Sequence, residues 1–152
     1  MDKGVYVLLL KNDACLIKTG ALGERTYGPG WHAYVGSAFG TGGFSRVTRH
    51  IRLNIEKSKR PRWHIDSLLL SPFFQVSRVY CIHTDQKIEC TIAQCITGTV
   101  IPGFGSSDCV CSGHLFYFSN DPHQDILSIL HSISEKNECI NRVEIWSPDP
   151  ES

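Results

Sequence analysis

Apolar residues dominate several short runs near the amino end of the chain, and residues typical of turns separate these runs. Residues 4–10 (GVYVLLL) and 14–20 (ACLIKTG) are rich in β-branched and other apolar side chains, which predicts two strands. Asn12 and Asp13 between them favour a hairpin turn that would pair the two strands. A further strand is expected over 31–38 (WHAYVGSA), so the sheet begins early in the chain.

The spacing of apolar residues changes to a helical period after the glycine-rich stretch that ends at residue 43. Apolar side chains at positions 44, 47, 51 and 55 form one stripe of a predicted helix over 44–55. The other faces of that helix carry Ser45, Arg46, Arg49, His50 and Arg52. Patterns further along predict helices over 61–72, 86–98 (closed by Gly98) and 121–136 (with Asp121 as N-cap), and strands over 73–84, 114–119 and, at a sheet edge, 141–146.

The length of 152 residues is that of one ordinary domain, so we expect a single domain over 1–146 and a disordered tail over 147–152. No apolar run approaches the ~20 residues that a membrane span needs, which argues against a membrane protein. The first residues lack the small-residue cleavage site of a signal peptide. Seven cysteines, an odd number, are scattered along the chain and predict reduced thiols. A cytoplasmic location is therefore predicted.

A formal net charge of zero hides a cationic segment. Residues 44–62 carry seven of the fifteen basic residues and a single acid, Glu56. Such a segment suits the phosphates of a nucleic acid, and it equally suits a solvated helix face. Charge alone leaves both interpretations open.

Candidate chemistry lies in and around this segment. Hydrolysis of a phosphodiester needs a base for the attacking water and positive charge for the oxygens that become more negative. Tyr34 lies in a strand next to a glycine-rich turn, and Arg46 and His50, four residues apart, share one helix face. Glu89, in the first turn of the helix over 86–98, supplies a carboxylate. Each residue also has a plain structural interpretation, as a sheet tyrosine, a solvated helix residue or an acid favoured by the helix dipole.

The ordered set of these residues resembles a known family. GVY at 4–6, YVG at 34–36, the pair Arg46 and His50, and Glu89 on a later helix resemble the GIY-YIG nuclease superfamily. The longer strings YVGSAFGTGGFSRVTRHIR, KRPRWHIDSLL and PGFGSSDCVC are similar to its small single-domain, Uri-type endonuclease-like branch. Valine replaces isoleucine in both tripeptides, which is a conservative packing change.

The resemblance implies an α/β (α+β) fold, with a small central antiparallel sheet of three core strands flanked by helices. The longer gap between Tyr6 and Tyr34 predicts an inserted strand or hairpin. The implied activity is DNA cleavage that depends on one Mg²⁺ or Mn²⁺ ion. The implied roles place Tyr6 and Tyr34 beside the nucleophilic water, Arg46 on the scissile phosphate, His50 in positioning or proton transfer, and Glu89 on the metal ion.

DNA contacts are expected from residues on either side of this site. The strand end and the turn would contribute backbone and hydroxyl groups, and the basic segment would contribute cations. His64 could line the substrate groove, but a buried pair with Asp66 that caps the second helix fits the sequence equally. The expected DNA-binding residues are Gly36, Ser37, Thr41, Arg49, Lys57, Lys59, Arg60, Arg62 and His64.

A separate cluster of Cys109, Cys111 and His114 could hold three corners of a zinc site. The spacing of the two cysteines departs from the usual Cys-x2-4-Cys, so inert thiols that pack a loop are the favoured interpretation.

The sequence leaves two other classes of function open. One is a catalytically weak nucleic-acid-binding module, and the other is a protein-interaction module associated with DNA repair. Either class would still predict a DNA or repair-protein partner. The structure of the preferred nucleic acid, and the choice between DNA and RNA, stay open.

Overall fold

The computed structural model describes residues 2–57, 60–104, 114–137 and 140–148. Its strands are β1 (Gly4–Asn12), β2 (Cys15–Thr19), β3 (Gly23–Tyr27), β4 (Gly30–Ala38), β5 (Phe74–His83), β6 (Thr99–Ile101), β7 (Leu115–Phe118) and β8 (Arg142–Trp146). Its helices are α1 (Ser45–Glu56), α2 (His64–Leu69), α3 (Glu89–Cys95) and α4 (His123–Asn137), and a short 3-10 helix covers Gly20–Leu22.

Six strands form one antiparallel sheet in the order β6-β7-β4-β1-β5-β8. β1 lies in the middle, where it pairs with β4 on one side and with β5 on the other. The predicted α+β fold, with an antiparallel sheet of three core strands and flanking helices, is confirmed. β6, β7 and β8 widen the sheet beyond that core, and β8 is the predicted edge strand.

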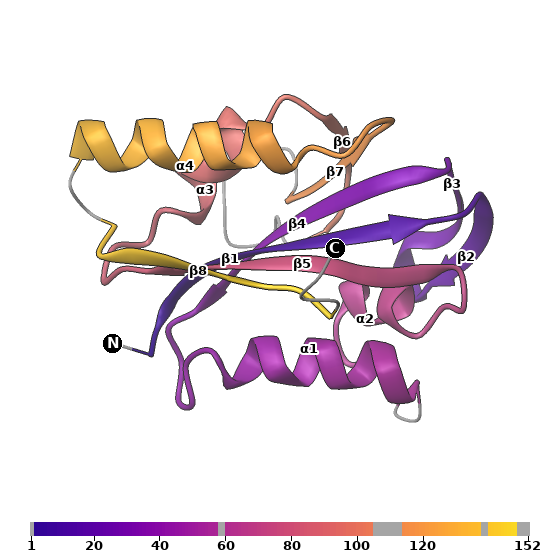
Figure 1. Cartoon of the computed structure of the whole chain (residues 1–152). Coiled ribbons are helices and arrows are strands. Elements are labelled where there is room, and N and C mark those ends of the chain that lie inside the picture. Colours follow the sequence, from indigo (N-terminus) through magenta and orange to yellow (C-terminus); the bar gives the residue numbers. More distant parts are fainter. Residues whose placement is uncertain (1, 58–59, 105–113, 138–139, 149–152) are drawn as a thin grey trace.

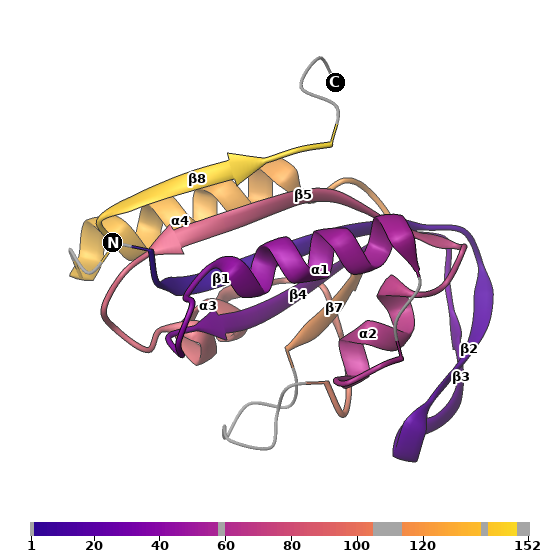
Figure 2. The same ribbon diagram turned by 90° about the horizontal axis from the view of Figure 1, so that it is seen from below.

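Helices cover both faces of the sheet, which explains why β1 is apolar without alternation. α3 and α4 lie on one face, and α1 and α2 lie on the other (Figure 1). Val5, Val7 and Leu9 of β1 belong to the hydrophobic cluster under α3 and α4. Tyr6, Leu8 and Leu10 belong to the cluster under α1 and α2. Tyr6 is thus directed to the α1 side, which is seen from below in Figure 2.

The predicted hairpin between residues 4–10 and 14–20 is wrong. Both edges of β1 are occupied by β4 and β5, so β2 has no free partner there and pairs with β3 instead. Asn12 is buried, and its side-chain amide donates to the carbonyls of Asp13 and Gly28 at the point where the chain leaves the sheet. The β2–β3 hairpin is the insertion predicted between Tyr6 and Tyr34.

The predicted helices are all present: α1 is shifted by one residue from the predicted 44–55, and α2, α3 and α4 are shorter than predicted. α3 ends at Cys95, three residues before the Gly98 that was expected to close it. Gly98 has a different role, since a Cβ atom there would lie 2.7 Å from Cζ of Phe118. α4 begins at His123, and Asp121 accepts the backbone N–H of His123, as expected of a capping residue.

The cysteines agree with the predicted reduced state only in part. Cys15, Cys81 and Cys95 are free thiols, whereas Cys90 is disulfide-bonded, so the prediction is wrong at Cys90. Within the described ranges, no helix combines the length and the apolar character that a membrane crossing requires. The cytoplasmic location and the single-domain bounds stay predictions, and residues 149–152 of the predicted tail lie outside the described residues.

Candidate active site

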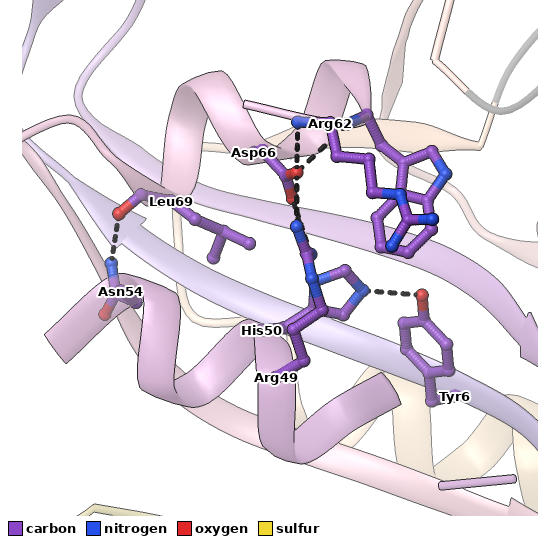
Figure 3. A network of polar contacts seen from close by, with 8 residues as sticks. Tyr6, Arg49, His50, Asn54, Arg62, Asp66 and Leu69 are labelled. Atoms are coloured by element: carbon purple, nitrogen blue, oxygen red, sulfur yellow. Dashed lines mark hydrogen bonds and ion pairs between the residues drawn. The ribbon is translucent and has the colours of Figure 1, made fainter. Parts of the chain in front are cut away.

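Tyr6, Tyr34 and His50 meet beneath α1, although they come from β1, β4 and α1. The ring centroids of Tyr6 and Tyr34 are 6.4 Å apart, and the Tyr6 hydroxyl lies 2.9 Å from Nε2 of His50 (Figure 3). Gly36 pairs with Tyr6 across the strands, and a Cβ atom on Gly36 would overlap the Tyr6 ring and hydroxyl. The glycine of the YVG tripeptide therefore makes room for the tyrosine of the GVY tripeptide.

Burial keeps this group of side chains neutral. Tyr6 and His50 are both almost completely buried. Burial raises the pKa of the Tyr6 hydroxyl far above its usual range and, against a smaller opposing effect of Arg46, raises the pKa of Tyr34. Burial also lowers the pKa of His50 to about 4. His50 at neutral pH is thus an uncharged imidazole that can accept a proton.

Asp66 of α2 lies behind His50 and is fully buried. It accepts two hydrogen bonds from the Arg49 guanidinium, at 3.2 and 3.0 Å, and the backbone N–H groups of Arg62 and Trp63, at 2.7 and 3.0 Å (Figure 3). Burial alone would raise the pKa of Asp66, but these hydrogen bonds outweigh it and hold the pKa below its usual value. Asp66 is therefore a charged, fully hydrogen-bonded carboxylate.

Trp63 gathers three arginines beside this carboxylate. The Cζ atoms of Arg46, Arg49 and Arg62 lie 5.0, 4.5 and 5.3 Å from the centroid of the Trp63 ring. Arg46 also donates a 2.9 Å hydrogen bond to the Ser37 carbonyl at the end of β4. The indole and the strand end hold cations that would otherwise repel one another.

A surface pocket of about 300 Å³ opens over the three arginines and Trp63. Its charge is positive, because Asp66 compensates only one of the three arginines. The remaining walls come from the turn before α1. Gly43 of this turn has φ of +51°, and the backbone of the turn packs against the backbone of Asp2. The residues of these walls are Gly40, Thr41 and Gly43 of the turn, Ala38 at the end of β4 and Ser45 at the start of α1.

Glu89 lies in the first turn of α3, the helix on the opposite face of the sheet from α1. Its Oε2 atom is buried and has no hydrogen-bond partner in the described part of the chain. Burial lowers the pKa of His114, and the Glu89 carboxylate opposes that shift, so the two side chains interact. An unpartnered carboxylate oxygen is the hard ligand that Mg²⁺ and Mn²⁺ prefer, so Glu89 fits the expected ion.

The structure thus joins Tyr6, Tyr34, Arg46 and His50 in one cluster, and no interaction among the described residues links Glu89 to it. Within the described ranges, no group of three or more His, Cys, Asp or Glu side chains is placed to hold a metal ion. The zinc candidates Cys109 and Cys111 lie outside the described residues. His114 is described, and its Nε2 atom lies 3.8 Å from the sulfur of Cys90.

The expected DNA-binding residues fall into two sets. Thr41, Arg49 and Arg62 line the pocket, and Gly36 and Ser37 lie in the adjoining part of β4. The others that the structure describes do not line the pocket. Lys57 donates to the carbonyls of Leu69 and Ser71. Arg60 and His64 are exposed, with Nδ1 of His64 3.4 Å from the Gly103 carbonyl oxygen, and Lys59 lies outside the described residues. The DNA contacts of both sets stay predictions.

Trp63 is the one prominent member of the site that the sequence did not point to. It is flanked by Arg62 and His64 in the string RPRWHID, and an aromatic residue among basic residues is a usable signal. Of the predicted pair His64 and Asp66, only Asp66 is buried and caps α2.

Comparison of the sequence with protein families gives one match, over residues 5–135, to the family described as Domain of unknown function DUF123. The chain belongs to the DUF123 family. The match extends from β1 into α4 and includes every residue of the cluster around Tyr6, His50 and Asp66. Searches of curated proteins and of solved structures gave no match for this DUF123 chain.

Proposed function

We propose that this DUF123 chain is a divalent-metal-dependent endonuclease of the GIY-YIG type that hydrolyses phosphodiester bonds in DNA. The observation that supports the proposal most strongly is the meeting of Tyr6, Tyr34 and His50 beside a cationic pocket that contains Arg46. These residues come from three separate elements. A chain that needed only a packed core would not require a neutral base and three arginines at one place.

In this proposal the Tyr6 hydroxyl and the His50 imidazole activate the attacking water together. The water gives a proton to the Tyr6 oxygen while the Tyr6 proton passes to Nε2 of His50, 2.9 Å away. The resulting hydroxide attacks phosphorus and the bond to the leaving oxygen breaks. The raised pKa of Tyr6 keeps its hydroxyl protonated at rest, so His50 is the final proton acceptor.

Arg46 supplies positive charge for the phosphate. Its hydrogen bond to the Ser37 carbonyl and its position over Trp63 fix the guanidinium at the pocket wall. A group that is oriented before the reaction stabilises the transition state without a further cost of reorganisation.

Glu89 would hold the Mg²⁺ or Mn²⁺ ion through its unpartnered oxygen. Such an ion, when bound, stabilises negative charge on the leaving oxygen.

Cleavage assays on a panel of labelled substrates test this proposal. The panel contains single-stranded, duplex, nicked and branched DNA and an RNA duplex, each with Mg²⁺, with Mn²⁺ and with a chelator. We expect Arg46→Ala to slow cleavage by about two to four orders of magnitude, and Arg46→Lys to recover only part of the loss. Glu89→Gln should abolish cleavage and leave DNA binding nearly intact.

The matched control is Arg52→Ala, because Arg52 is an exposed arginine on the same helix α1. It should cleave like the parent. A parent protein that binds DNA without cutting it under any condition would overturn the proposal in favour of a nucleic-acid-binding module. A protein that neither binds nor cuts would instead favour a protein-interaction module.

A further inference from the structure

Asp66 is a charged group that connects the arginine cluster to the candidate base, beside the Trp63 ring, whose centroid lies 6.0 Å from that of His50. Its Oδ1 atom accepts from Arg49 and lies 4.0 Å from Nδ1 of His50, and its Oδ2 atom accepts from Arg49 and from the two backbone amides at the start of α2. One of those amides belongs to Trp63, the residue on which the arginines lie. A single carboxylate thus contacts the arginine cluster and faces the candidate base.

We propose that Asp66 is a positioning residue for the proposed nuclease reaction: it holds His50 in the tautomer that carries its proton on Nδ1, so that Nε2 is free to accept the proton of Tyr6. The inference rests on the proposed function, and it assigns a role to a residue outside the tyrosine, arginine, histidine and glutamate set.

The geometry selects between the two neutral tautomers of His50. Nδ1 of His50 is buried and has no hydrogen-bond partner in the described part of the chain, and Oδ1 of Asp66 lies 4.0 Å from it. At 4.0 Å the contact is too long for a hydrogen bond, so the carboxylate acts through its charge. A proton on Nδ1 faces that charge favourably, whereas a lone pair on Nδ1 would be repelled by it.

The same charge stabilises His50 after it has accepted the proton. The charged or titratable groups around His50 are Tyr6 from β1, Arg46 and Arg49 from α1, and Asp66 from α2. Asp66 is the strongest of the charged groups acting on His50, and it favours the protonated imidazole, while Arg46 and Arg49 oppose protonation. Without Asp66 the imidazolium formed during the reaction would be buried beside two cations and no anion.

Helix capping alone does not account for a buried carboxylate at this position. Asp121 also caps a helix, since it accepts the backbone N–H of His123 at the start of α4, and it pairs with Arg78. Its side chain, however, is 41% exposed. A charge buried behind a histidine costs more in desolvation than a capping residue at the surface. Asp121 is therefore the natural control for the role of Asp66.

Two measurements test the role of Asp66. Nitrogen-15 NMR of the His50 ring in the parent protein reports the tautomer without any need for cleavage, and we expect the proton on Nδ1. The variant Asp66→Asn keeps an oxygen for the backbone amides and loses the charge. It should move the His50 proton toward Nε2 and lower kcat by about 10²-fold with little change in KM. Asp121→Asn should change neither the tautomer nor kcat.

The outcomes separate the inference from the proposed function. A parent protein that never cleaves overturns the proposed function. A parent His50 that carries its proton on Nε2, or an Asp66→Asn variant that folds and cleaves like the parent, overturns the role of Asp66. If Asp66→Asn does not fold, the tautomer of the parent protein alone decides.

Discussion

At the scale of single residues, the lack of a Cβ atom at Gly36 makes room for the ring of Tyr6. Gly36 of β4 stands opposite Tyr6 of β1, and the Tyr6 ring occupies the space that a side chain at position 36 would fill. The backbone of Gly36 does not need the left-handed region, because its φ lies outside it. The requirement for glycine is therefore one of space, and it serves the hydrogen bond between Tyr6 and His50.

The variant Gly36→Ala tests this requirement. The added methyl group would overlap the Tyr6 hydroxyl and lie 2.9 Å from Cε2, so the ring must move. We expect a loss of about 1–3 kcal/mol in the free energy of unfolding from overpacking. Displacement of the Tyr6 hydroxyl from His50 should also slow cleavage by about 10²-fold.

Gly28→Ala is the matched control, because Gly28 is not among the residues that line the pocket and a Cβ atom there would make only an ordinary contact, 3.4 Å from the Tyr117 hydroxyl oxygen. Urea denaturation and the cleavage assay measure the two effects. A Gly36→Ala protein as stable and as active as Gly28→Ala would show that Tyr6 tolerates displacement.

At the scale of elements, α1 is fixed to its neighbours by one buried amide. The Asn54 side chain donates to the carbonyls of Leu69 and Phe74 and accepts the backbone N–H of Val76. Lys57, in the left-handed conformation that ends α1, donates to the Leu69 carbonyl as well. These bonds join α1 to the end of α2 and to β5, and they set the position of the helix that carries Arg46, Arg49 and His50.

Asn54→Ala removes this connection. The Phe74 carbonyl and the Val76 N–H would lose this partner and the Leu69 carbonyl would keep only Lys57, so we expect the free energy of unfolding to fall by about 2 kcal/mol or more. Thr48→Ala on the exposed side of α1 should leave stability nearly unchanged. Urea denaturation of both variants is the measurement, and equal midpoints would mean that the Asn54 hydrogen bonds do not contribute to holding α1 in place.

The helices and the core strands could be predicted because periodicity is a local property. α1 follows from the apolar stripe that includes Val47 and Ile51, and the cluster of Tyr6, Tyr34, Arg46 and His50 follows from short motifs. The pairing of β2 with β3 could not be predicted, because it depends on which strands take the edges of β1. Asp66 and Trp63 reach the site only through the packing of α2 against α1, which no local pattern records.

At the scale of the whole molecule, the two most deeply buried of the histidines tie stability to pH. His32 of β4 and His50 of α1 are each about 1% exposed. Burial lowers the pKa of each to about 4, well below the usual value near 6.5. His32 interacts with Asn12 where the chain leaves the sheet, and His50 interacts with Tyr6 in the site. At His32 burial disfavours the charged imidazole, and at His50 burial outweighs the opposing effect of the Asp66 charge.

The fold should therefore lose stability as the pH falls from about 6.5 toward 4. Above about 6.5 both histidines are neutral in the folded and the unfolded chain, so they add no pH dependence. Between the two pKa values the unfolded chain binds a proton at each histidine and the folded chain does not, which costs about 1.4 kcal/mol per pH unit for each residue. Urea denaturation between pH 7 and 5 measures the slope of the free energy of unfolding against pH. Most carboxylates titrate below this range. His32→Gln and His50→Gln should each reduce the slope by about one proton, whereas Thr48→Ala, at an exposed residue whose side chain does not titrate, should leave it unchanged. If the slope is the same in the parent and in both buried-site variants, the folded protein accepts charged imidazoles at these positions. That result would also contradict the role of His50 as a neutral base.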